Sequence, residues 1–176
     1  LAGGASRRMG TDKALIDVEG EPMALRVAGT LRRAGLDRVV LVGGAPRGLG
    51  LPHVPDLHPG EGPLGGIVAA LADATTDSVF VVACDLARLD VPTVQALVAA
   101  AGVHDVTVAR THRTEPLCAV WRRSCLDRVR EAFDAGERSP LRVLAGLDTV
   151  EVDVSPNALT NVNTPADLSL FRRPGN

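Results

Sequence analysis

Aromatic side chains are scarce in this chain of 176 residues, which has three Phe, one Trp and no Tyr. Proteins that hold single-stranded nucleic acid stack the bases on aromatic rings, so this composition argues against such a partner. Basic residues are not in excess either, because 19 Lys and Arg stand against 21 Asp and Glu, for a formal net charge of -2 at pH 7. Without a positive field to hold a phosphate backbone, we expect no nucleic-acid partner.

The sequence also has few cysteines and no long apolar run. The three cysteines, Cys84, Cys118 and Cys125, form no C-x-x-C pair. This pattern argues against a disulfide framework or a zinc site and favours reduced thiols in the core. No apolar run approaches the ~20 residues needed to span a bilayer, and no charged-then-apolar signal segment opens the chain. We therefore expect a cytoplasmic protein with no membrane partner.

The remaining composition and the order of patterns predict one α/β domain over residues 1–176. A hydrophobic fraction of 45% is ordinary for a globular fold. Runs of β-branched residues predict strands at 38–42, 78–83, 105–109, 117–121 and 149–154. Helical periodicity and capping residues predict helices at 22–34, from Asp90, after Ser124 as an N-cap, and from Pro165 toward Phe171. This alternation is typical of a three-layer α/β/α sandwich with a mostly parallel central sheet.

The opening segment LAGGASRRMGTDKAL is the first that could carry chemistry. Leu1-Ala2 is predicted to end a strand, and Gly3-Gly4 would let the backbone approach a ligand with its amides available to oxyanions. Three cations follow within one loop and suit a polyphosphate: Arg7, Arg8 and Lys13. The G-x-G-x-x-G and P-loop motifs are both missing, and a solvated basic loop is the alternative interpretation.

A carboxylate follows the predicted strand 78–83 in the run FVVACDL. Asp85 would then lie at the carboxyl edge of the sheet, where open α/β folds bind their ligands. Carboxylate oxygens suit Mg²⁺, which usually joins one or two carboxylates to substrate phosphates. We expect Asp85 to hold Mg²⁺ beside a triphosphate, although an N-cap or turn aspartate is the simpler alternative.

A third segment, VPDLHPGEGPLGGI at 54–67, is a Gly- and Pro-rich loop that opens a helix near Leu64. The amides at the helix start could meet a base or ribose, and Asp56 could accept hydrogen bonds from either. His53, Asp56 and His58 are too irregularly spaced to predict a metal site, so a mobile polar loop is the default for the two histidines.

These segments resemble, in the same order, the motifs of the molybdenum cofactor guanylyltransferases. The opening is similar to that family's L-A-G-G-x-x-x-R-M-G-x-D-K signature, and five further motifs follow: GPLGGI at 62–67, CDL at 84–86, EPLCAVW at 115–121, GER at 136–138 and NVNTPADL at 161–168. The resemblance covers essentially the whole chain. Two positions depart from it. The chain has Gly43-Gly44 after Val42, where the family often places an Asn that touches the nucleotide, and Ala87 replaces the proline of C-D-x-P.

The resemblance implies a nucleotide-diphospho-sugar-transferase-like (Rossmann-like) fold, with nucleotide bound by the N-terminal half and acceptor by the C-terminal half. It implies transfer of GMP from GTP to molybdopterin carrying molybdenum, with Mg²⁺ as cofactor. The protein partners it implies are other molybdenum cofactor biosynthesis proteins or target molybdoenzymes. The site residues it implies are Leu1, Ala2, Gly3 and Lys13 for the nucleotide, Asp56 for its guanosine part, and Asp85 for Mg²⁺ and GTP. From the residues themselves we also expect Gly4 to lie beside the nucleotide, Lys13, Arg7, Arg8 and Asp85 to serve catalysis, and Asn161 and Asn163 to meet the acceptor.

Three alternatives remain open at this point. A related nucleotidyltransferase could use CTP or a different acceptor, such as a sugar phosphate. A non-catalytic nucleotide-binding module would be expected to lack Lys13 or Asp85, and both are present. A nicotinamide dehydrogenase is disfavoured because its glycine fingerprint is missing. For Asn161 and Asn163 the simpler interpretation is a capped turn before a helix.

Overall fold

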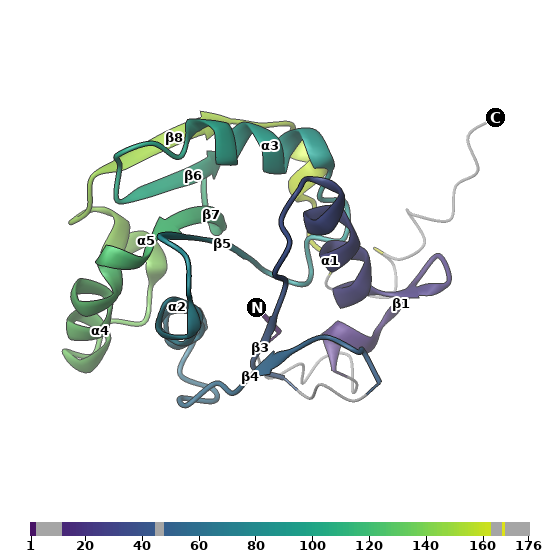
Figure 1. The fold of residues 1–176 in the computed structure, drawn as a ribbon, viewed down its shortest axis with the longest axis horizontal. Coiled ribbons are helices and arrows are strands. Elements are labelled where there is room, and N and C mark those ends of the chain that lie inside the picture. The colour runs from purple at the N-terminus through teal and green to yellow at the C-terminus, as the bar shows by residue number, and fades with distance from the viewer. Residues whose placement is uncertain (3–11, 45–47, 163–166, 168–176) are drawn as a thin grey trace.

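The computed structural model describes residues 1–2, 12–44, 48–162 and 167 (Figure 1). The predictions for Gly3, Gly4, Arg7, Arg8 and Asn163, and the helix predicted from Pro165, lie outside the described residues. The α-helices are α1 (Met23–Arg33), α2 (Pro63–Asp73), α3 (Val91–Ala100), α4 (Leu126–Asp134) and α5 (Pro140–Leu144). Short 3-10 turns lie at η1 (Lys13–Leu15), η2 (Arg123–Cys125) and η3 (Pro156–Leu159).

The larger sheet has the order β5-β7-β6-β8 and is made of β5 (Ser78–Val82), β6 (Val106–Arg110), β7 (Thr114–Arg122) and β8 (Thr149–Asp153). In this sheet β7 is antiparallel to both of its neighbours, while β6 and β8 are parallel. A second pair, β3 (Leu41–Val42) with β4 (His53–Val54), is parallel. The hairpin of β1 (Asp17–Val18) and β2 (Glu21–Pro22) precedes α1.

Residues 1–2 join the two sheets through backbone hydrogen bonds. The amide of Ala2 donates to Val42 O (2.8 Å) at the end of β3. On the other side Leu1 N donates to Val82 O and the amide of Cys84 donates to Leu1 O (3.0 Å). Leu1 thus forms hydrogen bonds with two residues of the neighbouring segment that are two positions apart, Val82 and Cys84. This is the hydrogen-bond pattern of parallel strands. The predicted strand end at Leu1-Ala2 therefore lies between β3 and β5.

Helices cover both faces of the larger sheet, as predicted (Figure 1). Alternate residues of β5, β6 and β7 point to opposite sides. One side, which includes Val81, Val108 and Trp121, packs with residues of α2, α4 and α5. The other side, which includes Val82 and Val120, packs with residues of α1 and α3. Because both faces are covered, the buried parts of these strands are almost entirely apolar, with Thr107 as a buried polar exception, in agreement with the apolar runs in the sequence.

Strand β3 is shorter than the predicted strand at 38–42, and Pro52 supplies the reason. The amide of Leu41 donates to Pro52 O (2.8 Å), and continuing the parallel ladder backward would require the amide of residue 52 to donate to Val39. Proline has no amide hydrogen, so the ladder stops there. A groove of about 330 Å³ lies next to this segment, between residues 35–42 and 78–82.

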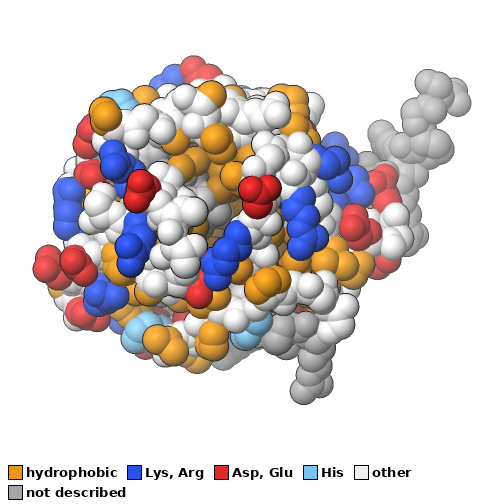
Figure 2. All heavy atoms as spheres, viewed as in Figure 1, with side chains coloured by type: hydrophobic (Ala, Val, Ile, Leu, Met, Phe, Trp, Pro, Cys, Tyr) orange, Lys and Arg blue, Asp and Glu red, His pale blue; other side chains and the backbone are white. Residues whose placement is uncertain are grey.

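Figure 2 shows this groove as a hollow floored by hydrophobic side chains, with Lys, Arg, Asp and Glu interspersed around it. Neither sign of charge dominates the face in view, which fits the nearly balanced composition. Among the residues that the structure describes, no helix is both long and apolar enough to cross a membrane.

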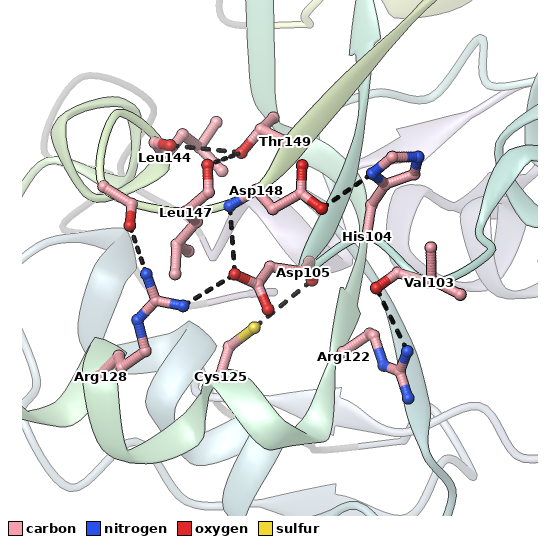
Figure 3. A network of polar contacts seen from close by, with 11 residues as sticks. Val103, His104, Asp105, Arg122, Cys125, Arg128, Leu144, Leu147, Asp148 and Thr149 are labelled. Carbon is pink, nitrogen blue, oxygen red and sulfur yellow. Dashed lines mark hydrogen bonds and ion pairs between the residues drawn. The ribbon is translucent and has the colours of Figure 1, made fainter.

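The predicted cap at Ser124 is wrong. Ser124 lies inside η2, and α4 begins only after Cys125, with no side-chain hydrogen bond at its cap. The start of α4 is held instead by a polar network at the amino edge of β6 and β8 (Figure 3). Arg128 Nη1 donates to Asp105 Oδ2 (2.8 Å), and the same carboxylate oxygen accepts from the amide of Asp148 (3.1 Å). These two contacts, the amide first, hold the pKa of Asp105 below its usual value.

Candidate active site

The carboxyl ends of four neighbouring strands form the edge at which the predicted site residues gather. From one side to the other the strands are β4, β3, residues 1–2 and β5, joined by the backbone hydrogen bonds described above and by Gly43 N to Val54 O (2.9 Å). Asp56 follows β4 by two residues, and Asp85 follows β5 by three. Both therefore lie at the edge where ligands bind in open α/β folds.

Lys13 and Asp85 meet at this edge although they are 72 positions apart. Lys13 Nζ lies 3.2 Å from Asp85 Oδ2, and the two side chains are 29% and 21% exposed, so a ligand can reach both. Lys13 opens η1, which Asp12 caps by accepting a hydrogen bond from the amide of Ala14 (3.0 Å). The methyl group of Ala14 is fully buried, which anchors the turn that carries Lys13.

Lys13 is also the only lysine in the sequence, where the other 18 of the 19 basic residues are arginine. An ammonium is a compact point charge that turns freely among acceptors, whereas a guanidinium is a flat fork. The pairing of this one ammonium with a strand-end carboxylate was not evident from sequence spacing.

The segment that contains Asn161 is fastened directly to Asp85. The amide of Val162 donates to Asp85 O (2.9 Å), and the Val162 side chain is fully buried with Val18, Met23 and Ala87. Asn161, the residue before, is partly exposed. The structure thus brings Lys13, Asp85 and the start of the NVNTPADL segment together.

Asp56 lies farther along the same edge. Three strand intervals separate β4 from β5, so at about 4.8 Å each the two strands lie roughly 14 Å apart. Asp56 Oδ1 accepts a hydrogen bond from the amide of His58 (2.9 Å), which closes a local turn. Asp56 and Asp85 thus follow strands at opposite sides of this four-strand edge.

Cys84, directly before Asp85, is an inert thiol. Burial raises its pKa to about 11, and the nearby Asp85 carboxylate adds to the shift in the same direction. A thiol with that pKa is protonated at neutral pH and is a poor nucleophile. This agrees with the interpretation of Cys84 as a buried residue at the end of a strand.

Sequence reasoning missed one cluster at the rim of the site. His58 and Glu61 in the loop after β4 contact Phe133 and Arg138, which lie at the end of α4 and beyond it. The GER motif contains Arg138, but nothing in the spacing of the motif shows that its partner lies 77 positions earlier.

An ammonium can bind phosphate oxygens, and a strand-end carboxylate can hold a cation that binds phosphates as well. The contact between Lys13 and Asp85 is therefore compatible with a nucleotide site. The sequence family of the MobA-like NTP transferase domain matches residues 1–151 of this chain. The chain therefore belongs to this family of nucleotidyltransferases. The resemblance seen in the sequence motifs is thereby confirmed.

Relatives and solved structures agree with this assignment. The molybdenum cofactor guanylyltransferase of Rhodobacter capsulatus is 37% identical over 176 aligned residues, which cover 96% of this chain and 90% of the relative. The crystal structure of molybdopterin-guanine dinucleotide biosynthesis protein A from Archaeoglobus fulgidus is similar with a TM-score of 0.77 and 26% identity, over 97% of this chain and 93% of that one. The 2-C-methyl-D-erythritol 4-phosphate cytidylyltransferase of Thermus thermophilus has a TM-score of 0.72 at 15% identity, over 90% and 91% of the two chains, and shares the fold alone.

Proposed function

We propose that this chain transfers GMP from GTP to the phosphate of molybdopterin carrying molybdenum, and releases pyrophosphate. The observation that carries the proposal is the meeting of Lys13, Asp85 and the Asn161 segment at one edge of the sheet. The named activities of the relatives supply the substrate class. The N-terminal half then provides most nucleotide contacts, and the C-terminal segment around Asn161 and Asn163 receives the acceptor.

In this reaction a phosphate oxygen of the acceptor attacks the α-phosphorus of GTP in line. A new P–O bond forms as the bond from the α-phosphorus to the bridging oxygen breaks, and pyrophosphate leaves with that oxygen. The nucleophile is already ionised at neutral pH, so the protein needs no general base. Its contribution is positioning and charge stabilisation. Lys13, with Arg7 and Arg8, stabilises the leaving pyrophosphate, while Leu1, Ala2, Gly3 and Gly4 lie along the nucleotide and Asp56 accepts hydrogen bonds from its guanosine.

Asp85 is the residue that would hold Mg²⁺. Its carboxylate is partly exposed at the sheet edge, and one strand-end carboxylate together with substrate phosphates is a set that this ion commonly accepts. Bound there, the ion would offset negative charge between the α-phosphate and the leaving group. The same carboxylate lies 3.2 Å from the ammonium of Lys13.

Thermal protection by nucleotides tests the base preference directly. With Mg²⁺ present, GTP should raise the melting temperature more than CTP does, since only the favoured nucleotide binds the folded state tightly. Pyrophosphate release should then require GTP and molybdenum-loaded molybdopterin together. Greater protection by CTP, or release with a sugar phosphate as acceptor, would contradict the proposal and favour the alternative nucleotidyltransferase. That alternative has one supporting observation, namely that Gly43-Gly44 stands where the family often carries a nucleotide-binding Asn.

Other proteins of molybdenum cofactor biosynthesis, or the molybdoenzymes that receive the product, are the proposed protein partners. The product is a large charged cofactor, and passing it directly to a recipient protein would limit its release to water. Co-purification with a molybdoenzyme that lacks its cofactor tests this part of the proposal.

A further inference from the structure

The loop between β4 and α2, residues 55–62, contacts the C-terminal half of the chain through Glu61 and His58. Arg138 Nη2 pairs with the carboxylate of Glu61 in this loop. Its Nη1 donates to two backbone carbonyl oxygens, those of Phe133 (2.7 Å) and Glu137 (2.8 Å). The guanidinium carbon also lies 4.1 Å from the centre of the Phe133 ring.

A second contact joins the same loop to the same ring. The His58 ring lies against Phe133, with 4.6 Å between ring centres and 54° between their planes. Gly65 packs closely against both side chains, because a Cβ at this position would come within 3.3 Å of His58 Cβ and 3.4 Å of the Phe133 ring. Phe133 is buried, so it offers a fixed surface on which the loop is seated.

The hydrogen bonds of the loop connect this anchor to Asp56. The amide of Glu61 donates to His58 O (3.1 Å), and the amide of His58 donates to Asp56 Oδ1 (2.9 Å). A displacement of Glu61 or of the His58 ring would therefore move Asp56. An exposed ion pair alone holds a loop weakly. Here the guanidinium is itself fixed by two carbonyls and a ring, which a lysine could not reproduce.

We infer that Arg138 is a positioning residue for nucleoside recognition: it holds the 55–62 loop so that Asp56 meets the nucleoside and not the phosphates of the substrate. The inference rests on the proposed function for the identity of the nucleoside, guanosine. It also assigns a residue of the C-terminal half to nucleotide binding, where the sequence suggested that this half serves the acceptor. Arg138 touches no reacting atom in this account, so its loss should affect binding and spare the chemical step.

The test compares Arg138→Ala with Arg130→Ala, a matched control. Arg130 lies on α4 and pairs with Asp127 (3.1 Å) in an exposed i,i+3 contact that does not reach the loop. If Arg138→Ala leaves the loop in its binding conformation about one-tenth of the time, the KM for GTP and its Kd rise about tenfold and kcat stays within about twofold. Binding of inorganic tripolyphosphate should not change, because that ligand has no nucleoside. Arg130→Ala should change none of these quantities.

Hydrogen exchange supplies a readout that needs no turnover. The amides of His58 and Glu61 should exchange faster in Arg138→Ala than in the wild type, and Arg138→Lys should restore this protection only in part. If Arg138→Ala folds poorly, Glu61→Gln breaks the same ion pair and should give the same changes at smaller amplitude. Unchanged exchange, or equal weakening of GTP and tripolyphosphate, would overturn the inference. A wild type that binds another nucleotide in place of GTP contradicts the proposed function and leaves the exchange result to decide the role of Arg138.

Discussion

Replacing Lys13 by alanine should separate catalysis from stability. The ammonium lies 3.2 Å from Asp85 Oδ2, and both side chains are partly exposed. A pair of this kind contributes about 1 kcal/mol at most, which for a domain of this size is about 2–4 °C in melting temperature. The same ammonium, bound to phosphate oxygens of GTP in the transition state, should contribute about 1.5–3 kcal/mol, or roughly ten- to a hundredfold in turnover.

The assay is steady-state pyrophosphate release, with the melting temperature measured on the same preparations. Arg38→Ala is the control, because Arg38 pairs with Asp73 (2.7 Å) beside the groove and away from the Asp85 edge. It should lose a similar amount of stability and none of the activity. Lys13→Arg should recover only part of the turnover, since a flat guanidinium cannot take the position of a compact ammonium.

Two outcomes would refute this reasoning about Lys13. Turnover within about twofold of the wild type in Lys13→Ala would show that the ammonium does not act on the phosphates. A large fall in melting temperature that accounts for the lost activity would show a structural role. The single lysine also allows a chemical check. GTP should protect the Lys13 peptide from acetylation by an amine reagent, as followed by mass spectrometry.

Three further predictions follow from the same site and core. Asp85→Asn should abolish metal-dependent transfer while binding of GTP without metal survives, because the amide lacks the charge that a hard cation needs; persistence of metal-dependent activity would place the metal elsewhere. Asn163→Ala should lower kcat at saturating GTP with an unchanged melting temperature, whereas full activity with a loss of roughly 1 kcal/mol of stability would indicate a structural turn. Burial raises the pKa of Cys84 to about 11 and that of Cys118 to about 12, so native thiols should react slowly with a thiol reagent near pH 8. Since the unfolded thiols ionise at a lower pH, near 9, the unfolding free energy should fall as pH rises from about 9 to 11, a trend that urea titrations across this range would measure.

Helices and buried strands could be read from the sequence where local patterns decide the structure. The strand predicted at 78–83 is present as β5 (Ser78–Val82). Asp90, which accepts a hydrogen bond from the amide of Thr93 (2.9 Å), caps α3 as predicted. Ser124 failed as a cap because tertiary contacts between Arg128 and Asp105 place the start of α4 one residue beyond Cys125. A capping residue predicts a helix start from local sequence alone. Tertiary packing and a salt bridge can stabilise a different start, and the local prediction is then wrong.

The reversed strand β7 could not be deduced from its sequence either. The segment 117–121 reads as a buried strand in either direction, and its direction is set by the hairpin that joins β6 to β7 through residues 111–113. The contacts within the site could likewise be predicted only in part from the sequence. Asp85 could be placed at the sheet edge from its position after a strand, but its contact with Lys13 depends on η1, a turn anchored by the buried Ala14.

The Lys13–Asp85 pair has a consequence for how substrate and metal would bind. The ammonium and the carboxylate form an ion pair with each other. A triphosphate that draws Lys13 away leaves Asp85 as an uncompensated carboxylate, which favours a cation there, and a cation on Asp85 releases Lys13 for the phosphates. Each ligand thus removes a contact that opposes the other, and the affinity gain must be equal in both directions. We therefore expect this site to bind the nucleotide or the metal ion weakly when either is alone and more tightly when both are present.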